Sequence, residues 1–277
     1  MSKVSKKETF NFGDIWKNRV LIWKLSKNDF KKRYAGSYLG KVWAFVQPVV
    51  TVLMYWIVFD KLMKTKVQMI NPSLNKDLPY LVFLTSGLVP WFFFSEGLSG
   101  GTSALIEYNY LVKKVVFNIN ILPVIKLVSA SFTHIFFAGI LVLVTILEGI
   151  SPSVYMLQII YYSFCTFMIT LALIYATSSV VIFFKDLQQI IIIVLQLGMW
   201  ATPIMWNIND QSEKIQMIMK INPLCYIVDG YRNSIYGGKF FWEEGWYNLY
   251  FWGITIVLFI IGTKIFTKLK VHFADVM

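Results

Sequence analysis

The chain has 277 residues, of which 57% are hydrophobic and 15% charged, whereas about a quarter of the residues in soluble domains are charged. This composition excludes an ordinary soluble protein and predicts an all-α integral membrane protein. The net charge of +11 does not indicate nucleic-acid binding, because the basic residues alternate with apolar runs and no recognition motif accompanies them. Charges placed in this way orient the chain and attract anionic membrane lipids.

The first segment, residues 1–40, is predicted to lie in the cytoplasm and to contain an amphipathic interfacial helix over residues 12–34. Aromatic and aliphatic side chains recur there at steps of three, four and seven, while Lys17, Lys24 and Lys31 share another face. Helices of this composition lie in the headgroup region of a membrane. A membrane anchor and a helix that docks a partner protein are equal alternatives. No signal peptide is expected to be cleaved from this end.

The remaining residues, 41–277, are predicted to form a six-helix transmembrane domain. The first span, residues 42–59, follows Lys32, Arg33 and Lys41, so it starts in the cytoplasm. The other spans are expected at 78–102, 121–147, 154–184, 187–206 and 246–266, followed by a cytoplasmic tail at 267–277. In this topology 18 of the 26 basic residues fall in the cytoplasmic segments and their flanks. The sequence therefore predicts that both ends of the chain are cytoplasmic.

Two connections between spans carry structure of their own. The loop at 107–120 is short, basic and cytoplasmic, and it has an apolar helical stripe that needs a protein or membrane surface to cover it. Residues 207–245 are predicted to form two short amphipathic helices at the outer surface. The first lies near 212–221, and the second ends at Gly237 and Gly238.

The familiar motifs of catalysis are absent from the sequence. It contains no GxxxxGK[ST] phosphate loop, no HExxH, no Cys/His zinc pattern and no GxSxG elbow. We therefore expect no catalytic residue, no metal site and no cofactor in this chain. Glu96, Lys126 and His134 are the ionisable residues deepest in apolar runs. We interpret them as structural contacts between spans two and three, because a proton relay needs acids on several spans.

Aromatic residues cluster in spans one, two and five, near Gln and Gly positions. Aromatic planes stack on the C–H faces of sugar rings, so such residues suit a path for a sugar polymer. Aromatic belts at the two membrane interfaces explain the cluster equally well. The candidates for the path are Trp43, Phe45, Trp56, Trp91, Phe92, Phe93, Trp200 and Trp206.

Several segments, in this order and spacing, are similar to a known family. They are RYAGSYLGKVWAFVQPVV, SGLVPWFFF, NYLVKKVVFNINILPV, FFKDLQQII and TPIMW followed by NPLCYIVDGYR. The chain resembles, over nearly its whole length, the permease subunit of type-2 ABC transporters that export cell-surface polysaccharides such as teichoic acids, O-antigens and capsules. Asn118 departs from the pattern, since relatives commonly have Pro after this Phe.

The resemblance implies a homodimer bound to two copies of a separate ATPase, which binds the ATP and Mg. A lipid-linked polysaccharide would pass between the two halves, across the cytoplasmic membrane of a bacterium. Carried over to this sequence, the residues that contact the ATPase are Trp23, Asp29, Lys32, Arg33, Tyr34, Tyr108, Leu111, Val112, Lys113, Lys114, Val115 and Phe117. The outer-gate residues are Ile215, Ile218, Pro223, Ile227 and Tyr231.

Two other functions fit a polytopic membrane protein. An ion-coupled secondary transporter usually shows repeated halves and midplane charges, and neither is visible here. A membrane-embedded glycosyltransferase that depends on a metal needs paired carboxylates on a loop. The adjacent acids Glu243 and Glu244 lie on the expected outer surface. The sequence favours the permease over both alternatives.

Overall fold

The long apolar segments of the sequence become the long helices of the fold. The computed structural model describes residues 12–36, 38–64, 79–113, 117–236 and 238–276, and within them it contains helices and no strand. The helices are α1 Phe12–Lys17, α2 Arg19–Arg33, η1 Gly40–Val42, α3 Trp43–Trp56, η2 Ile57–Leu62, α4 Tyr80–Thr102, α5 Ala104–Glu107, α6 Asn109–Val112, η3 Ile119–Ile121, α7 Leu122–Leu147, η4 Val154–Leu157, α8 Gln158–Val180, α9 Leu187–Ala201, η5 Ile208–Asp210, α10 Glu213–Lys220, α11 Pro223–Tyr236, α12 Gly245–Lys270 and α13 Phe273–Val276.

Five helical segments of the described chain are long and apolar enough to cross a membrane. They are Gly40–Leu62, Tyr80–Thr102, Ile119–Leu147, Val154–Val180 and Gly245–Lys270, each close to a predicted span. The predicted span at 187–206 corresponds to α9, which has 15 residues. A helix of that length is about 22 Å long, shorter than the ~30 Å hydrocarbon core. By length and composition, the described residues therefore contain five candidate membrane spans.

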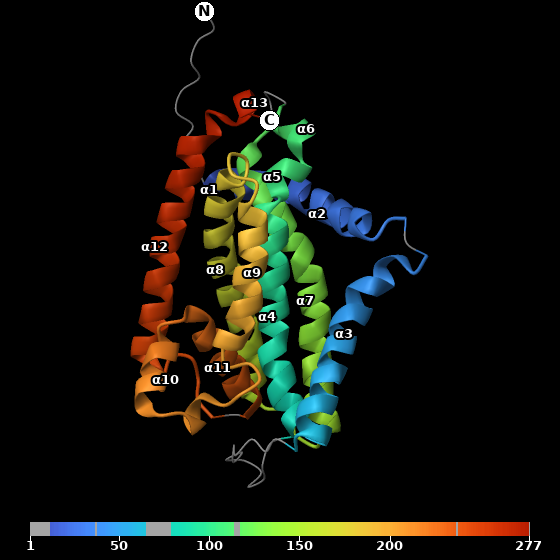
Figure 1. The fold of residues 1–277 in the computed structure, drawn as a ribbon, viewed down its shortest axis with the longest axis vertical. Helices are drawn as coiled ribbons and strands as arrows, with labels where there is room; N and C mark the ends of the chain where they lie inside the picture. Colours follow the sequence, from blue (N-terminus) through green and yellow to red (C-terminus); the bar gives the residue numbers. More distant parts are fainter. Residues whose placement is uncertain (1–11, 37, 65–78, 114–116, 237, 277) are drawn as a thin grey trace, which may run out of the picture.

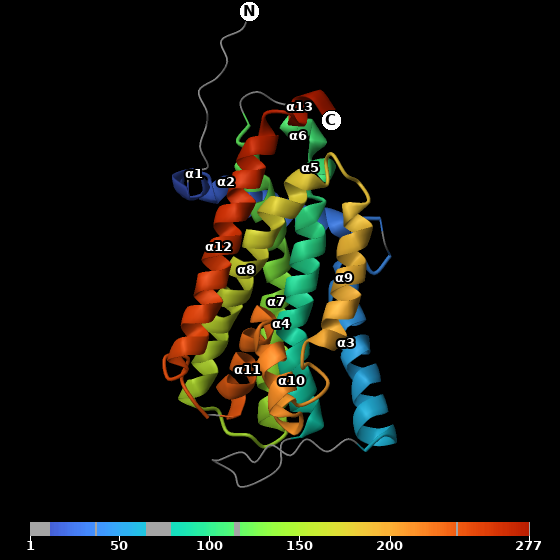
Figure 2. The ribbon, with the colours of Figure 1, turned by 60° about the vertical axis from the view of Figure 1, so that its left-hand side comes forward.

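Helix α4 is the centre of the bundle, and it packs against α7, α8 and α11. In its most apolar window 78% of the residues are buried, compared with 6% in the segment that contains α3. Figure 2 shows α12 on one side of this core, where it packs along α8, and α3 on another side. The core therefore consists of α4, α7, α8, α11 and α12, while α3 contributes little to it.

The structure corrects the prediction of two surface helices between residues 207 and 245. α10 is at the surface, but most of α11 is buried, including Tyr226, Ile227 and Tyr231. α11 has large apolar or aromatic side chains around most of its circumference, so it packs among α4, α8 and α12. The guanidinium of Arg232 is also buried, and its Nη2 donates to the carbonyl oxygen of Ile204 at 2.9 Å.

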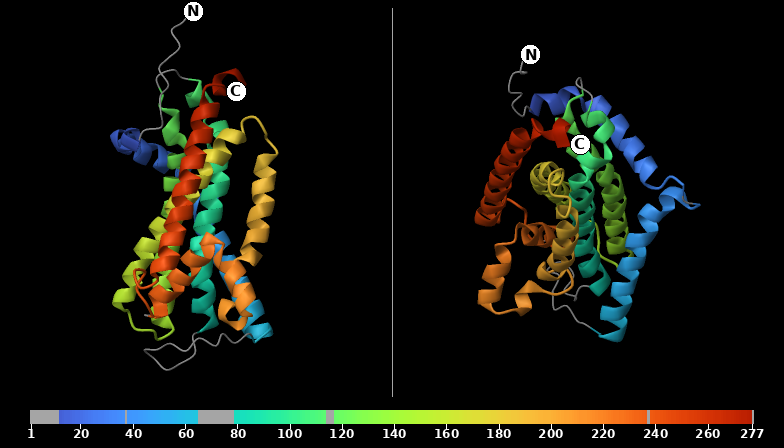
Figure 3. Two further views of the ribbon diagram at one scale, coloured as in Figure 1. Left: turned by 90° about the vertical axis from the view of Figure 1, so that its left-hand side faces the viewer. Right: turned by 45° about the horizontal axis from the view of Figure 1, so that its top comes forward.

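The two ends of the bundle carry different elements. Figure 3 shows α1, α6 and α13 at one end, and α10 at the other. The first and last described helices thus lie at the same end of the molecule. The turn between α8 and α9 also lies at that end, so α9 runs back along the bundle beside α4.

The contact between α8 and α12 depends on a glycine at the point of closest approach. A Cβ added at Gly262 would lie 2.4 Å from the backbone oxygen of Ala172. Backbone oxygens cannot move aside as a flexible side chain can, so any larger residue must push the two helices apart. Gly253, in the same helix, has no atom within 4 Å of its added Cβ.

We predict that Gly262→Ala destabilises the protein and that Gly253→Ala does not. Overpacking of a tight contact costs about 1–3 kcal/mol, whereas alanine at an open helical site is neutral or slightly stabilising. The measurement is the melting temperature of the purified chain in detergent. Equal melting temperatures for the two variants would show that the α8–α12 contact tolerates the extra methyl group.

Candidate functional site

A buried polar stripe on α2 fastens this helix across one end of the bundle. The buried residues of α2 are Ile22, Ser26 and Asp29, at steps of four and three, so they share one helix face. Ser26 Oγ donates to the carbonyl oxygen of Ile125 in α7 at 2.9 Å. The aromatic face that the sequence emphasised is more open, with Trp23 50% exposed. α2 therefore docks through its polar face.

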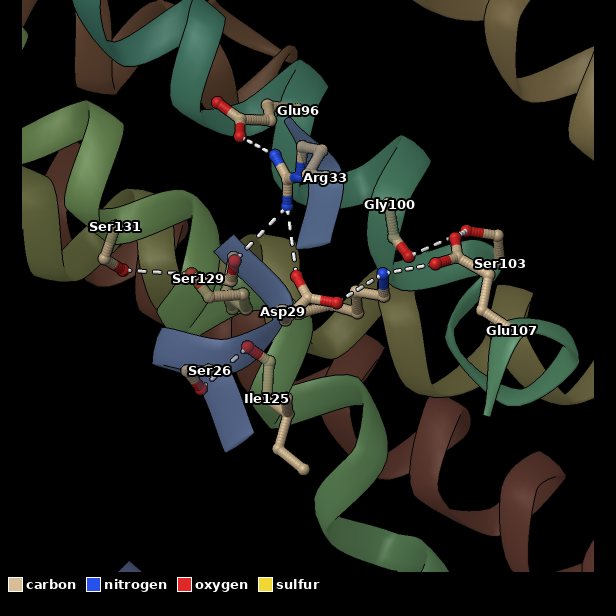
Figure 4. A network of polar contacts seen from close by, with 12 residues as sticks. Ser26, Asp29, Arg33, Glu96, Gly100, Ser103, Glu107, Ile125, Ser129 and Ser131 are labelled. Carbon is tan, nitrogen blue, oxygen red and sulfur yellow. Dashed lines mark hydrogen bonds and ion pairs between the residues drawn. The ribbon is translucent and has the colours of Figure 1, made fainter. Parts of the chain in front are cut away.

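Asp29 is the centre of a charged cluster that joins three parts of the chain. Its Oδ1 accepts a hydrogen bond from the Tyr108 hydroxyl at 2.9 Å and lies 2.7 Å from Nζ of Lys126. The side chains of Asp29 and Lys126 are each 6% exposed. Arg33 Nη2 lies 3.4 Å from Oδ2 of Asp29. One carboxylate thus contacts α7, the junction of α5 and α6, and its own helix. Figure 4 shows Asp29 beside Arg33.

The ion pairs extend from Asp29 in two directions. Arg33 pairs with Glu96 of α4, and Lys126 Nζ lies 2.5 Å from Oε2 of Glu107. Glu96 and Lys126 therefore do not pair with each other across spans two and three, which corrects that interpretation. Glu96 pairs with Arg33 of α2 (Figure 4), and Lys126 pairs with Asp29 of α2 and with Glu107, just after span two.

The cluster borders a cavity of about 500 Å³ between α2, α4, α5 and α7. Burial alone would raise the pKa of the Asp29 carboxyl. The charge and the hydrogen bond of Lys126 outweigh burial and lower this pKa below its usual value. Burial, together with the charge of Asp29, raises the pKa of the Tyr108 hydroxyl. At neutral pH Asp29 is therefore charged and Tyr108 is protonated, as their hydrogen bond requires.

The cavity suits a structural cluster better than a metal centre. Asp29 and Glu107 already have Lys126 between them, and Glu96 has Arg33. Within the described residues no group of three His, Cys, Asp or Glu side chains is arranged to hold a metal ion.

The other residues expected to contact an ATPase lie around the same end of the bundle. Trp23 packs edge-on against Phe132 at 5.2 Å, and Tyr34 packs against Phe30 at 5.6 Å. Lys32 lines the cavity from its rim. Trp23 and Phe30 thus both pack against Phe132 of α7, although Trp23 stays 50% exposed.

The expected stripe on the loop at 107–120 is largely covered by the chain itself. Tyr108 and Val112 are buried, Leu111 and Phe117 are partly buried, and Lys113 is exposed. Lys114, Val115 and Val116 lie outside the described residues. The surface that α6 leaves open therefore includes Lys113 and also Tyr110, which is 52% exposed.

The structure divides the aromatic candidates into buried and exposed groups. Trp91 and Phe93 are buried, and Trp91 lies against Gly198, where an added Cβ would be 3.0 Å from its ring. Trp43 and Trp200 are 45% and 60% exposed. The other candidates, Phe45, Trp56, Phe92 and Trp206, are partly buried. Phe45 packs on Phe136, and Phe92 packs near Phe137. The ring of Trp56 faces Lys61, and Trp206 donates a hydrogen bond to the carbonyl oxygen of Trp200.

A second polar contact joins three core helices around His134. Its Nε2 lies 2.9 Å from Ser163 Oγ in α8 and 3.1 Å from the Tyr231 hydroxyl in α11. The expected contact of His134 with span two is a ring stack on Phe93 of α4 at 4.4 Å, whereas its hydrogen bonds join α7 to α8 and α11. Of the expected gate residues, Ile215 and Ile218 are exposed on α10, Pro223 begins α11, and Ile227 and Tyr231 are buried.

Sequence reasoning missed several members of the charged cluster. Glu107 and Ser103 lie at the end of span two, and Gln188 of α9 donates to the carbonyl oxygen of Ser99 at 3.3 Å. The available signal was the spacing of Ser26, Asp29 and Arg33, which marks one polar face of α2. The more frequent aromatic residues on other faces of the helix concealed it.

Comparison with known proteins gives a consistent result. A family model described as ABC-2 type transporter matches residues 20–236. A protein of Klebsiella pneumoniae, named O-antigen export system permease protein RfbA, is 27% identical over 277 residues, which cover 99% of this chain and 100% of that protein. A protein of the same name from Myxococcus xanthus is 27% identical over 95% of this chain and 97% of its own length.

We predict that Asp29→Asn lowers the stability of the protein by about 3 kcal/mol, because it removes the buried one of the two carboxylates that pair with the Lys126 ammonium. The double variant Asp29→Asn/Lys126→Met should recover part of this loss. Asp60→Asn is the control, since its partner Lys61 is 59% exposed and such pairs contribute little. Thermal unfolding in detergent gives the three values, and a double variant no more stable than Asp29→Asn would contradict the coupling.

The contribution of the Asp29–Lys126 pair to the stability of the protein has a defined pH dependence. A carboxyl whose pKa is lowered by folding stabilises the protein above its unfolded pKa of about 3.9 and loses that contribution only as the pH falls through the lower folded value. The difference in melting temperature between the wild type and Asp29→Asn should therefore stay constant from pH 5 to pH 8.

Proposed function

The chain belongs to the ABC-2 type transporter family, and we propose that it is the permease subunit of an ATP-driven exporter of a lipid-linked cell-surface polysaccharide. The polymer is a glycan of the O-antigen or teichoic-acid class, and it crosses the cytoplasmic membrane of a bacterium. The observation that carries this proposal is the match, over 95% of the chain or more, to relatives named as O-antigen export permeases.

The arrangement of the helices supports a topology of six crossings. In this proposal α9 and the residues after it add a sixth crossing to the five candidate spans, and an even number returns the end of α12 to the end of the bundle where α2 lies. In this topology α2, α6 and α13 face the cytoplasm, and α10 and the start of α12 face outward. The three lysines at the end of α12, at positions 264, 268 and 270, agree with the positive-inside rule.

We propose that two copies of the chain form the transport path between them. The apolar faces of α3 and α9 support this arrangement, since Leu53, Leu197 and Trp200 are 45%, 66% and 60% exposed. Trp43 and Trp200 are the aromatic candidates best placed to meet a sugar polymer. Trp91 and Phe93 stabilise the packing of α4, because they are buried against its neighbours. The α10 residues Ile215 and Ile218 belong to the outer gate.

A separate ABC ATPase subunit supplies the energy in this proposal. The permease is itself non-catalytic, and ATP and Mg bind to two copies of the ATPase. The coupling surface consists of α2 and α6, with Tyr110 and Lys113 exposed on α6. The charged cluster around Asp29 links this surface to α4 and α7, so a displacement of α6 reaches the membrane helices through hydrogen bonds and ion pairs.

Deletion of the gene tests the proposed function. Cells that lack the chain should lose the surface polysaccharide and accumulate lipid-linked polymer inside the cytoplasmic membrane. The control keeps the permease and carries an inactive ATPase subunit, and it should give the same result. Normal surface polysaccharide in the deletion strain would contradict the proposal, and so would ATP hydrolysis by the purified chain alone.

We predict that Trp43→Ala and Trp200→Ala each reduce export several-fold while the complex with the ATPase stays intact. The loss of one ring–sugar stacking contact is expected to cost about 1 kcal/mol, enough for this effect. Trp242→Ala is the matched control, since Trp242 is 58% exposed but lies between α11 and α12. Quantified surface polysaccharide provides the measurement, and unchanged export in both test variants would assign these rings to the aromatic belt.

A further inference from the structure

A groove of about 600 Å³ lies between α10 and the first turn of α12. The last apolar span begins at Gly245, so the groove is at the depth where α12 enters the bilayer. Trp246 and Leu249 are 88% and 66% exposed there. Exposed Trp at the start of a span is typical of the membrane–water interface. The groove therefore lies at the level of the lipid headgroups.

The two walls of the groove carry opposite charges that do not neutralise each other. Lys220 lies on α10, and Glu243 and Glu244 precede α12. Among the described residues neither Lys220 nor either glutamate has an oppositely charged side chain within 4.0 Å. The partner found for Glu244 is neutral, since its Oε1 accepts a hydrogen bond from Asn233 at 3.3 Å. The groove thus offers a cation on one side and anions on the other.

The rest of the lining is aromatic and apolar. Trp246, Tyr247 and Tyr250 contribute rings, and the hydroxyl of Tyr247 is buried with no hydrogen-bond partner in the described part of the chain. Aromatic faces attract ammonium groups. Met217 and Ile221 line the α10 side and are 72% and 64% exposed, which suits contact with acyl chains.

We propose that this groove binds the headgroup of a zwitterionic phospholipid with a primary ammonium, of the phosphatidylethanolamine class. Lys220 receives the phosphate. Glu243 and the face of Trp246 receive the ammonium. The acyl chains run along Met217 and Ile221. A sugar also stacks on aromatic rings, but the separated opposite charges and the apolar wall at bilayer depth favour the lipid. This inference does not depend on what the protein transports.

Native mass spectrometry of the full chain in detergent tests the proposal, with added phosphatidylethanolamine or phosphatidylglycerol. The two lipids share the phosphate, but phosphatidylglycerol has no ammonium. The wild type should retain phosphatidylethanolamine preferentially. Glu243→Gln should weaken phosphatidylethanolamine binding about tenfold and leave phosphatidylglycerol binding unchanged, whereas Lys220→Gln should weaken both. Glu213→Gln, on the same helix but outside the groove, is the matched control.

Three results would overturn the proposal. The first is equal retention of the two lipids by the wild type. The second is an equal loss of both lipids in Glu243→Gln. The third is displacement of bound lipid by soluble chitotetraose, which would identify a saccharide site. Melting temperatures of the variants, measured in the same detergent without added lipid, separate a lost binding site from a lost fold.

Discussion

The buried ion pair between Asp29 and Lys126 determines how the N-terminal helix meets the bundle. Two charges that are each only 6% exposed cannot be separated without a large cost in free energy, because each would be left buried without its opposite charge. Tyr108 and Glu107 complete the hydrogen bonding of this pair. The position of α2 is therefore fixed by these polar contacts together with the packing of Trp23 and Phe30 on Phe132 of α7, while half of the Trp23 surface stays exposed.

This arrangement explains which features the sequence could reveal. Five of the six spans predicted from runs of apolar residues correspond to long apolar helices close to the expected positions, because the length of a span depends on composition and bilayer thickness. α9 was placed correctly at its start, Leu187, but ends at Ala201. Thr202 and Pro203 follow it, and proline disfavours a helical conformation in the residue before it. The predicted span continued through these residues because their neighbours are apolar. The spacing of apolar residues does not indicate where such a helix ends.

The candidate site was less predictable for a different reason. Glu96 and Lys126 were recognised as unusual from their apolar surroundings, but their partners lie 63 and 97 residues away in the chain, at Arg33 and Asp29. Pairing across such separations depends on the angle at which α2 crosses the bundle, which no local pattern encodes. α11 shows the same limit, since its amphipathic spacing gave the correct boundaries but not its burial among three other helices.

The contrast between α2 and α3 has a consequence for how the molecule changes shape. α2 is fastened by the Asp29 cluster, and α4 is buried on most sides, so moving either of them breaks hydrogen bonds or exposes core residues. α3 follows α2 directly, yet among Trp43–Trp56 only Ala44 is buried. Elements with few buried contacts are displaced at the lowest cost in free energy. A displacement of α2 therefore reaches α4 and α7 through the polar contacts of the Asp29 cluster, while α3 and α9, each with a single buried residue, can adjust their positions with little disruption of the core.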